Sequence, residues 1–450
     1  MNMTTGQPLK LLILFAVPML IGNLFQQVYN LADSIIVGRL IGARALAAVG
    51  STHSVTFLFF SVCSGMSSGG GIVVSQCFGA GDDRRVKKAI TNSAYLMLVS
   101  SLVMGTAAFL ASASVLHLIR TPQDILPDAV TYMRMACISV PLIAVYNYSS
   151  SMLRALGDST TPLYFLVTAC VINVFLDLLF VGPLALGVFG AALATMLSQL
   201  LAGIGCMIFA VRTNPYFRLG REDFRFDRDV TLRAIRLGLP LSLQWAMIAV
   251  STTGLQTVVN SFGSTAVAAF TATTRIENLV HMPFGSLGQA LATYAGQNYG
   301  AGKPERIRLG FRQSTMLMAG MAAFMLVVMQ LFGSYIVGAF VKDPDVIALG
   351  GSGIKLTSWF YAFLGLIYVT RGIQNGVGDA LFAFINGLIE MTARIGLPVL
   401  MMRIFDLGVM VIWWTAGLTW VISALCCLGR YLSWRGRHSA QPLQDRKPAL

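Results

Sequence analysis

Charged residues are scarce in this sequence. They make up 11% of the 450 residues, whereas a soluble globular domain carries about 25%. Histidine is also rare, with 4 residues, and none of the 7 cysteines shows metal-ligand spacing with a histidine. No metal motif, nucleophile–base arrangement or phosphate-binding loop is recognisable. These shortages exclude an ordinary soluble enzyme, and we expect neither catalytic activity nor a bound cofactor.

The sequence is instead rich in long apolar blocks. Hydrophobic residues make up 56% of the chain, and a block of about 20 residues is long enough to cross a bilayer. Twelve spans are predicted, at 11–38, 45–79, 88–112, 127–153, 160–181, 188–212, 232–260, 266–299, 308–334, 346–371, 379–402 and 408–432. We therefore predict an all-α membrane protein with twelve transmembrane helices.

The net charge of +13 is concentrated in particular loops. Basic residues cluster after even-numbered spans, in 84–88, 212–236, 303–312 and 430–447. Loops rich in Lys and Arg stay on the cytoplasmic side of a membrane. The clusters therefore predict a multi-pass protein of the plasma (inner) membrane with both termini cytoplasmic, and they do not indicate a nucleic-acid partner.

The two halves of the chain repeat each other at an offset of 221 residues. Three matched pairs share this offset: Ile41-Gly42 with Phe262-Gly263, Gly79-Ala80-Gly81 with Gly300-Ala301-Gly302, and Gly157-Asp158 with Gly378-Asp379. Because each repeat holds an even number of spans, we expect two pseudo-symmetric six-helix lobes related by an axis along the membrane normal. The predicted parts are an N-terminal lobe (1–212), a cytoplasmic linker (213–230), a C-terminal lobe (231–434) and a cytoplasmic tail (435–450).

Two aspartates, Asp33 and Asp177, lie inside apolar spans of the first half. A charge at the bilayer centre costs about 2.5–3.5 kcal/mol, so such residues usually face a cavity or a partner and have a function. Asn173 shares a helix face with Asp177, and Thr195 could donate to a carboxylate or bond back to its own helix. The simpler alternative for Asp33 is a helix cap or a pair with Arg39. Two acids in one poorly hydrated pocket favour the uptake of a proton or a small cation.

The first span carries a polar stripe. Gln26, Asn30 and Asp33 follow helical spacing, and Tyr29 lies one turn before Asp33. These side chains are candidates for lining a substrate cavity. Pro18 removes one backbone hydrogen bond from the same helix and can produce a bend.

The second half lacks an equivalent of Asp177, because Pro398 stands at that position. Its spans carry Arg275, Glu277, Glu390 and Arg394 instead. The spacing of Glu390 and Arg394 favours an ion pair within one helix, whereas Arg275 and Glu277 point to different sides and need partners elsewhere. We interpret these residues mainly as buried structural pairs, with a coupling or substrate role for Glu277 as the alternative.

The chain resembles the multidrug and toxic compound extrusion (MATE) family over nearly its whole length. The resemblance rests on AVPMLIGNLFQQVYNLADSIIVGRLIG near the start, on QCFGAGD and QNYGAGK at the ends of the second and eighth spans, and on RALGD after the fourth. It implies two six-helix lobes around a cavity, a monomer in contact with membrane lipid, and export of cationic, amphipathic compounds in exchange for protons or Na⁺.

The resemblance also implies roles for individual residues. In the DinF-like branch the first lobe carries a proton and cation network, and the matching positions here are Asp33, Asn173, Asp177 and Thr195, with Tyr29 and Gln26 nearby and Pro18 at the bend. In the NorM-like branch acids in the seventh and tenth spans bind Na⁺. This chain has Ile248 in the seventh span and no acid in the tenth. The DinF-like branch is therefore favoured.

These features predict a secondary antiporter that works by rocker-switch alternating access. A lipid-linked oligosaccharide flippase of the same superfamily is the alternative. It would need a strongly basic cavity for a pyrophosphate group, and few basic residues lie inside the spans.

Overall fold

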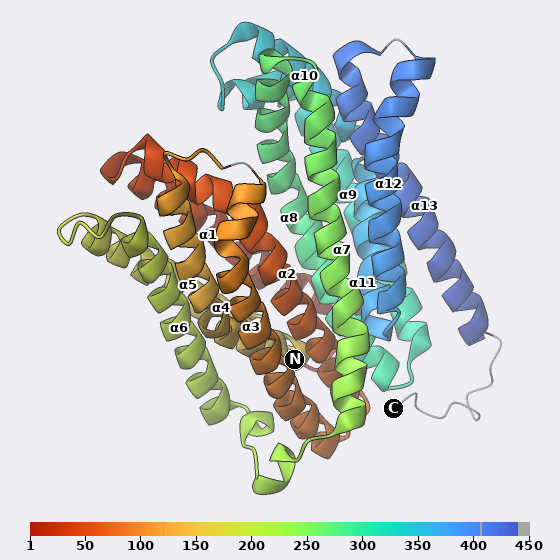
Figure 1. Ribbon diagram of the computed structural model, residues 1–450. Helices are drawn as coiled ribbons and strands as arrows, with labels where there is room; N and C mark the ends of the chain where they lie inside the picture. Colours follow the sequence, from red (N-terminus) through yellow and green to blue (C-terminus); the bar gives the residue numbers. More distant parts are fainter. Residues whose placement is uncertain (120, 406, 440–450) are drawn as a thin grey trace. The chain divides into compact units, whose positions relative to one another are not determined.

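A computed structural model describes residues 1–119, 121–405 and 407–439 of the chain. The described residues are almost entirely helical (Figure 1). The first half contains α1 (Pro8–Leu40), α2 (Ala43–Gly79), α3 (Asp83–Leu118), α4 (Leu126–Ala155), α5 (Thr160–Val181), α6 (Gly187–Thr213), η1 (Pro215–Phe217) and η2 (Arg221–Phe224). The second half contains α7 (Arg228–Asn260), α8 (Ser264–Gly300), α9 (Pro304–Gly338), α10 (Pro344–Ser358), α11 (Tyr361–Val377), α12 (Ala380–Ile404), η3 (Gly408–Met410) and α13 (Val411–Ser439).

The helices match the predicted spans closely. Among the described residues, ten helices are long and apolar enough to cross a membrane, and α10 with α11 qualifies as one bent pair. Helix α8, which carries Arg275, Glu277 and His281, is 37 residues long but does not reach the same hydropathy. Counted with α8, the helices give the predicted twelve crossings.

The predicted span at 346–371 is made of two helices and not of one continuous helix. Helices α10 and α11 are bent by 52° at the break between them. At the break, the amides of Trp359 and Phe360 donate to Leu356 and Thr357, which are three residues back instead of four. The Phe360 ring lies against Gly417 and 5.8 Å from the ring of Trp414 on α13. Packing of this aromatic residue on α13 replaces the regular helical turn.

The chain forms two compact units. Unit 1 comprises Met1–Asn2 and Val17–Ser242, and unit 2 comprises Met3–Ala16 and the chain from Leu243 onward. Helices α1 and α7 therefore each contribute to both units, and each changes unit within two residues of an internal proline, Pro18 or Pro240. The predicted lobe boundaries at 212 and 231 stay a prediction, and residues 440–450 of the predicted tail lie outside the described residues.

The internal repeat is visible in the geometry of the backbone. Helices α2 and α8 have the same length and begin and end 221 residues apart. All three matched pairs contain glycines with positive φ: 114° and 90° at Gly42 and Gly263, 72° and 66° at Gly81 and Gly302, and 87° and 92° at Gly157 and Gly378. Residues with a Cβ atom rarely adopt this conformation. The repeated glycines therefore mark equivalent helix ends.

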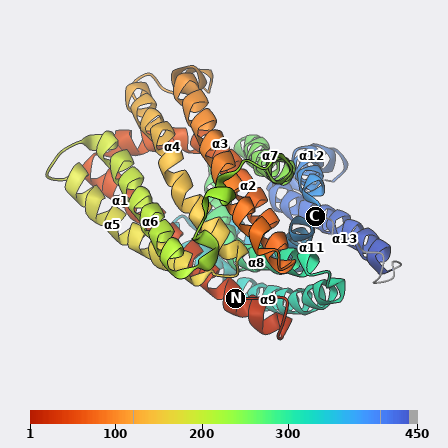
Figure 2. The same ribbon diagram turned by 90° about the horizontal axis from the view of Figure 1, so that it is seen from below.

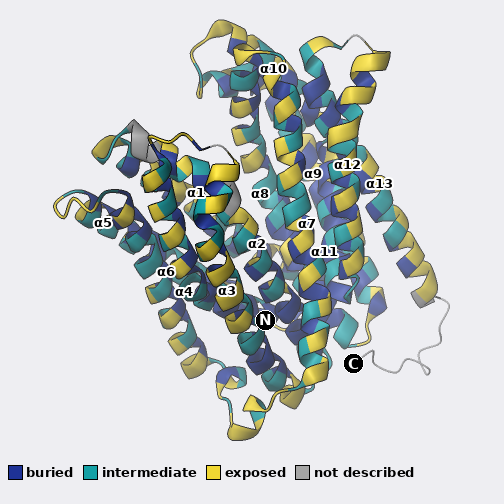
Figure 3. Ribbon diagram, viewed as in Figure 1, coloured by how far each residue is buried: buried dark blue, intermediate teal, exposed yellow. Residues whose placement is uncertain are grey.

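Each unit packs around a central helix. In unit 1, α4 contacts α2, α3 and α6, and in unit 2, α11 contacts α8, α9 and α13 (Figure 2). Exposed bands run along the outer helices (Figure 3), and they include large apolar residues such as Val171 and Phe175 on α5. A bilayer requires apolar side chains on the surface that faces lipid. It also requires that backbone polar groups be satisfied inside each helix, and these long helices meet both requirements.

The linker between α6 and α7 folds against the start of α3. Tyr216 Oη donates to Asp83 at 2.8 Å, and Arg84 pairs with Glu222 at 3.2 Å. Burial and the nearby Asp83 carboxylate raise the pKa of Tyr216 to about 12. These contacts hold the basic linker on unit 1.

Candidate functional site

Four helices of unit 1 bring polar side chains together within the spans. Asp33 comes from α1, Asn173 and Asp177 from α5, Thr195 from α6 and Tyr132 from α4. The carboxyl groups of Asp33 and Asp177 lie within hydrogen-bonding reach of each other. Asp177 and Asn173 have no exposed surface, whereas Asp33 is partly exposed. The two acids are therefore neighbours, with Asp177 shielded from solvent and Asp33 partly accessible, and we call these residues with Asn173, Thr195 and Tyr132 the Asp33–Asp177 pocket.

Several oxygens in this pocket lack a donor. Among the described residues, the two carboxylate oxygens of Asp177 have no hydrogen-bond partner, and the amide oxygen of Asn173 has none either. A buried polar oxygen without a partner costs about 1–3 kcal/mol, and more when it is charged. Two carboxylates in contact also repel each other unless a proton or cation lies between them. The arrangement can therefore hold a proton shared by the two acids, or a small cation bound by oxygens.

Hydroxyl groups close one side of the pocket. Tyr29 Oη lies 3.1 Å from Thr195 Oγ1, and Asn173 Nδ2 donates to the same oxygen at 3.5 Å. Thr195 therefore contacts residues of two other helices, but neither contact is with a carboxylate, so both interpretations of its hydroxyl stay open. The amide nitrogen of Asn173 is bonded to Thr195, whereas its amide oxygen has no partner among the described residues. Among the described residues no three His, Cys, Asp or Glu side chains form a metal cluster, so a cation here would take amide and hydroxyl oxygens as further ligands.

Tyr132 is a residue of this site that the sequence did not reveal. It lies on α4, is partly buried, and interacts electrostatically with both Asp33 and Asp177. It also packs against an apolar cluster that contains Val37 and Val181. A tyrosine near the start of an apolar span, with no polar stripe around it, gives no signal in the sequence.

The remaining candidates of the first span differ in how far they are buried in the protein. Gln26 is partly buried and Asn30 is exposed, and Pro18 lies inside the unbroken helix α1. Arg39 is exposed, and no ion pair in the described part of the chain joins it to Asp33. The roles of Gln26 and Asn30 in a substrate cavity and of Pro18 in a bend stay predictions.

The expected ion pair between Glu390 and Arg394 is wrong. Glu390 on α12 pairs with Arg371 on α11, and its Oε1 also accepts from Asn386 and Ser423, each within 3.0 Å. Arg394 turns away from Glu390 and donates to hydroxyl groups on α7. The i, i+4 spacing places both residues on one face of α12, but the neighbouring helices decide which charges meet.

Arg275 and Glu277 have different surroundings. Arg275 is exposed on α8, so the interpretation of it as a buried pair is wrong. Glu277 is partly buried and contacts Thr357, which is close to the break between α10 and α11. Its Oε1 has no partner among the described residues.

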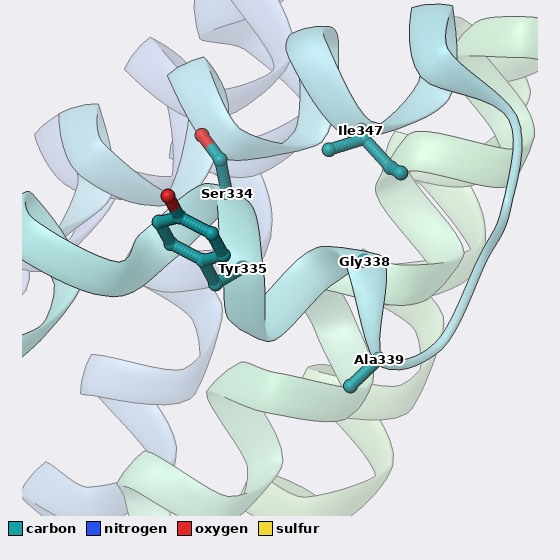
Figure 4. Close-up of a pocket in the computed structure, with 5 residues that line it drawn as sticks. All are labelled: Ser334, Tyr335, Gly338, Ala339 and Ile347. Carbon is teal, nitrogen blue, oxygen red and sulfur yellow. The ribbon is translucent and has the colours of Figure 1, made fainter.

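A surface depression of about 470 Å³ lies apart from these polar groups (Figure 4). Four of its lining residues, Ser334, Tyr335, Gly338 and Ala339, come from the end of α9, and Ile347 comes from α10. It contains no charged side chain, and Tyr335 is 80% exposed.

Comparison with known proteins agrees with this geometry. The sequence pattern of the MatE family matches residues 18–179 and 240–400, which is one segment in each half. The chain belongs to the MatE family. It is 31% identical to the probable multidrug resistance protein YpnP of Bacillus subtilis over 390 residues, covering 86% of this chain and 87% of that protein.

Other MatE relatives differ in the cargo for which they are named. The chain is 24% identical to the FAD transporter of Shewanella oneidensis, covering 81% of this chain and 82% of that protein. A solved MOP superfamily transporter from Pyrococcus furiosus aligns with a TM-score of 0.90 at 23% identity, over 99% of this chain and 98% of that chain. The structural likeness confirms the fold, and the chain is a multi-pass membrane protein of a transporter family.

Proposed function

We propose that this MatE protein exports amphipathic organic compounds, cations foremost, in exchange for protons or Na⁺ bound between Asp33 and Asp177. The observation that carries the proposal is the buried contact of two carboxyl groups, one of which has no donor among the described residues. Relatives named for multidrug resistance support a small-molecule cargo. The placement of basic loops supports an inner-membrane protein with cytoplasmic termini, and the resemblance to the family supports a monomer.

The exchange follows from competition for charge. When a proton or cation occupies the Asp33–Asp177 pocket, it removes the repulsion between the two acids, and the protein reorients so that the site opens toward the cytoplasm. When the ion leaves there, substrate binds in its place, and the negative pocket attracts a cation. Ion and substrate must each lower the affinity for the other, and couplings of about 1–3 kcal/mol are typical. This cycle is alternating access of the rocker-switch type.

The test is transport of a fluorescent organic cation by purified protein in proteoliposomes. A pH gradient and a Na⁺ gradient are imposed separately, which identifies the coupling ion. Asp33→Asn should abolish gradient-driven export, because an amide cannot exchange a proton, and the variant should still fold and bind the dye. Asp128→Asn is the matched control, since Asp128 is a partly exposed acid in the first turn of α4 and contributes no oxygen to the Asp33–Asp177 contact. Full gradient-driven export by Asp33→Asn would refute the proposed coupling.

A further inference from the structure

The segment that precedes α1 is bound to unit 2 through its backbone. The amide of Met3 donates to Gln297 Oε1 at 2.9 Å, and the carbonyl of Met3 accepts from Asn298 Nδ2 at 3.1 Å. These three residues are completely buried. Arg306 donates to Met3 O at 3.2 Å and to Gly6 O at 3.0 Å. Hydrogen bonds to the main chain therefore fix the position of this segment.

The first turn of α1 is held by the same unit. Leu9 N donates to Gln313 Oε1 on α9 at 3.0 Å. An amide in the first turn of a helix has no acceptor inside that helix, so the glutamine supplies the missing partner. Lys303 Nζ adds a hydrogen bond to Thr4 O at 3.0 Å. We call the residues of unit 2 that make these contacts the α1 clamp: Gln297, Asn298, Lys303, Arg306 and Gln313.

Unit 1 holds the start of α7 from equivalent positions of the repeat. Gln76 and Asn92 lie 221 residues before the two glutamines of the α1 clamp. Asn92 Oδ1 accepts at 2.9 Å from the amide of Asp227, which immediately precedes α7. Gln76 Oε1 accepts from Arg233 on α7 at 2.6 Å. The glutamines that open the QCFGAGD and QNYGAGK motifs therefore have the same role, because each holds the first helix of the other half.

Each helix held in this way continues into the other unit. Residues 3–16 belong to unit 2, whereas α1 from Val17 onward, Asp33 included, belongs to unit 1. Helix α7 shows the reverse order, since it belongs to unit 1 up to Ser242 and to unit 2 beyond it. A movement of one unit therefore acts on a helix whose start is attached to the other unit.

The contacts of the α1 clamp favour an attachment that persists during transport. Release would take a partner from two buried amides at once, those of Gln297 and Asn298, and each such loss costs free energy. It would also expose the buried side chain of Met3. The binding of one ion or one substrate shifts a conformational equilibrium only modestly. The clamp is therefore expected to stay closed while unit 1 moves.

We infer that the two clamps are fixed points about which α1 and α7 bend during transport, and that Arg306 is a positioning residue for the ion site on α1. The inference rests on the proposed export function. Because its start is fixed on unit 2, α1 cannot follow unit 1 as a rigid rod, and the part that carries Asp33 is displaced relative to that start. Access to the ion site is thereby tied to reorientation. A loosened start would let Asp33 exchange its ion without reorientation, so the ion would leak without export.

Hydrogen–deuterium exchange of the purified full-length protein tests whether the α1 clamp stays closed. A peptide that contains Met3 and Leu9 is followed by mass spectrometry at one pH, without ligand, with the fluorescent cation ethidium, with Na⁺, and in Asp33→Asn, which imitates a neutralised ion site. Protection should be the same in all four cases. Arg306→Met should speed the exchange about tenfold, as expected for the loss of charged hydrogen bonds. Faster exchange with ethidium, with Na⁺ or in Asp33→Asn would overturn the inference, because the clamp would then be a latch that opens.

Transport in proteoliposomes tests the positioning role. Arg306→Met should lower the maximal rate of ethidium export about tenfold and leave the ethidium concentration for half-maximal export unchanged. It should also raise the influx of the coupling ion in the absence of ethidium. A variant that only folds poorly loses export and cannot gain ion influx. Arg306→Lys keeps one charged donor for the segment and should restore most of the export rate.

A control and a second variant separate positioning from folding. Arg312→Met removes an exposed charge from the same helix and should change neither exchange nor transport. If Arg306→Met does not fold, Gln313→Leu removes only the acceptor of Leu9 N, and it should speed exchange and raise ion influx in the same way. Loss of export without a gain in ion influx, in whichever variant folds, would overturn the positioning role.

The two measurements also distinguish this inference from the proposed function. Native protein that keeps the segment protected in every condition but exports no ethidium under either gradient overturns the proposed function and leaves the fixed attachment of α1 standing. Native protein that exports ethidium, while ethidium speeds exchange of the segment, overturns the fixed attachment alone.

Discussion

In unit 1, Asp177 is fully buried, has no donor among the described residues and contacts a second acid, Asp33. In unit 2, Glu390 is only 6% exposed, yet it contacts Arg371 and accepts hydrogen bonds from two further side chains. A mobile ion would not further stabilise a buried carboxylate that is already fully paired. A buried acid without donors is stabilised only when an ion arrives, and we therefore propose that unit 1 carries the exchange while the Glu390 cluster stabilises unit 2.

The largest expected effect concerns Asp177. Asp177→Asn should reduce gradient-driven export to background, because the remaining acid no longer shares a proton or cation. Its free energy of unfolding should stay within about 1 kcal/mol of the native value or rise, since a buried carboxylate without donors is replaced by a neutral group. Export assays and thermal unfolding in detergent measure the two quantities. Loss of stability together with loss of export would indicate that Asp177, like Glu390, mainly stabilises the fold.

The opposite result is expected for Arg371. Arg371→Gln leaves Glu390 as a buried acid without its cation, which costs about 3–5 kcal/mol of stability. Replacing both residues by apolar ones, as in Arg371→Met with Glu390→Leu, should recover most of that loss. Denaturant unfolding of the single and double variants gives the comparison. A single variant as stable as the native protein would remove the contrast between the units.

The sequence predicted those features that depend on one helix at a time. Span limits agree with the helices to within a few residues, because the length of an apolar block is a local property. The repeat was also predictable, since the glycines of each pair need the same positive φ. Asp33 and Asp177 were expected to meet, and they do, because the cost of an isolated charge in a span leaves few other arrangements.

Contacts between helices were harder to predict. Whether Glu390 meets Arg394 or Arg371 depends on the rotation and depth of α11 and α12, and the i, i+4 spacing contains no information on either. Tyr132 reaches the acids only because α4 presents that face to α1 and α5. The break at Phe360 depends on its packing against α13. Each of these features is set by a second helix that lies far away in the sequence.

A third prediction concerns one repeat position that the two units use differently. Tyr132 in unit 1 corresponds to Gly353 in unit 2, where a Cβ atom would collide with the buried ring of Trp413. Gly353→Ala should therefore destabilise the protein by about 1–3 kcal/mol through overpacking. Gly396→Ala is the control, since no atom lies within 4 Å of its added Cβ, and it should be neutral or stabilising by up to about 1 kcal/mol. Equal effects in thermal unfolding would show that Trp413 moves aside easily.

The smallest expected effect comes from the two prolines where α1 and α7 change unit. Pro18→Ala and Pro240→Ala each restore a backbone donor inside a helix, and each should raise the free energy of unfolding by roughly 1 kcal/mol. Both should slow turnover, because a helix shared by two units that move must bend. Only α1 carries an acid of the ion site, so Pro18→Ala should also shift the ion concentration that gives half-maximal export, whereas Pro240→Ala should leave it unchanged. Transport measured over a series of pH or Na⁺ values separates these outcomes. If both variants shifted the ion concentration for half-maximal export equally, ion binding would not depend on which helix is stiffened, and the expected difference between α1 and α7 would be wrong.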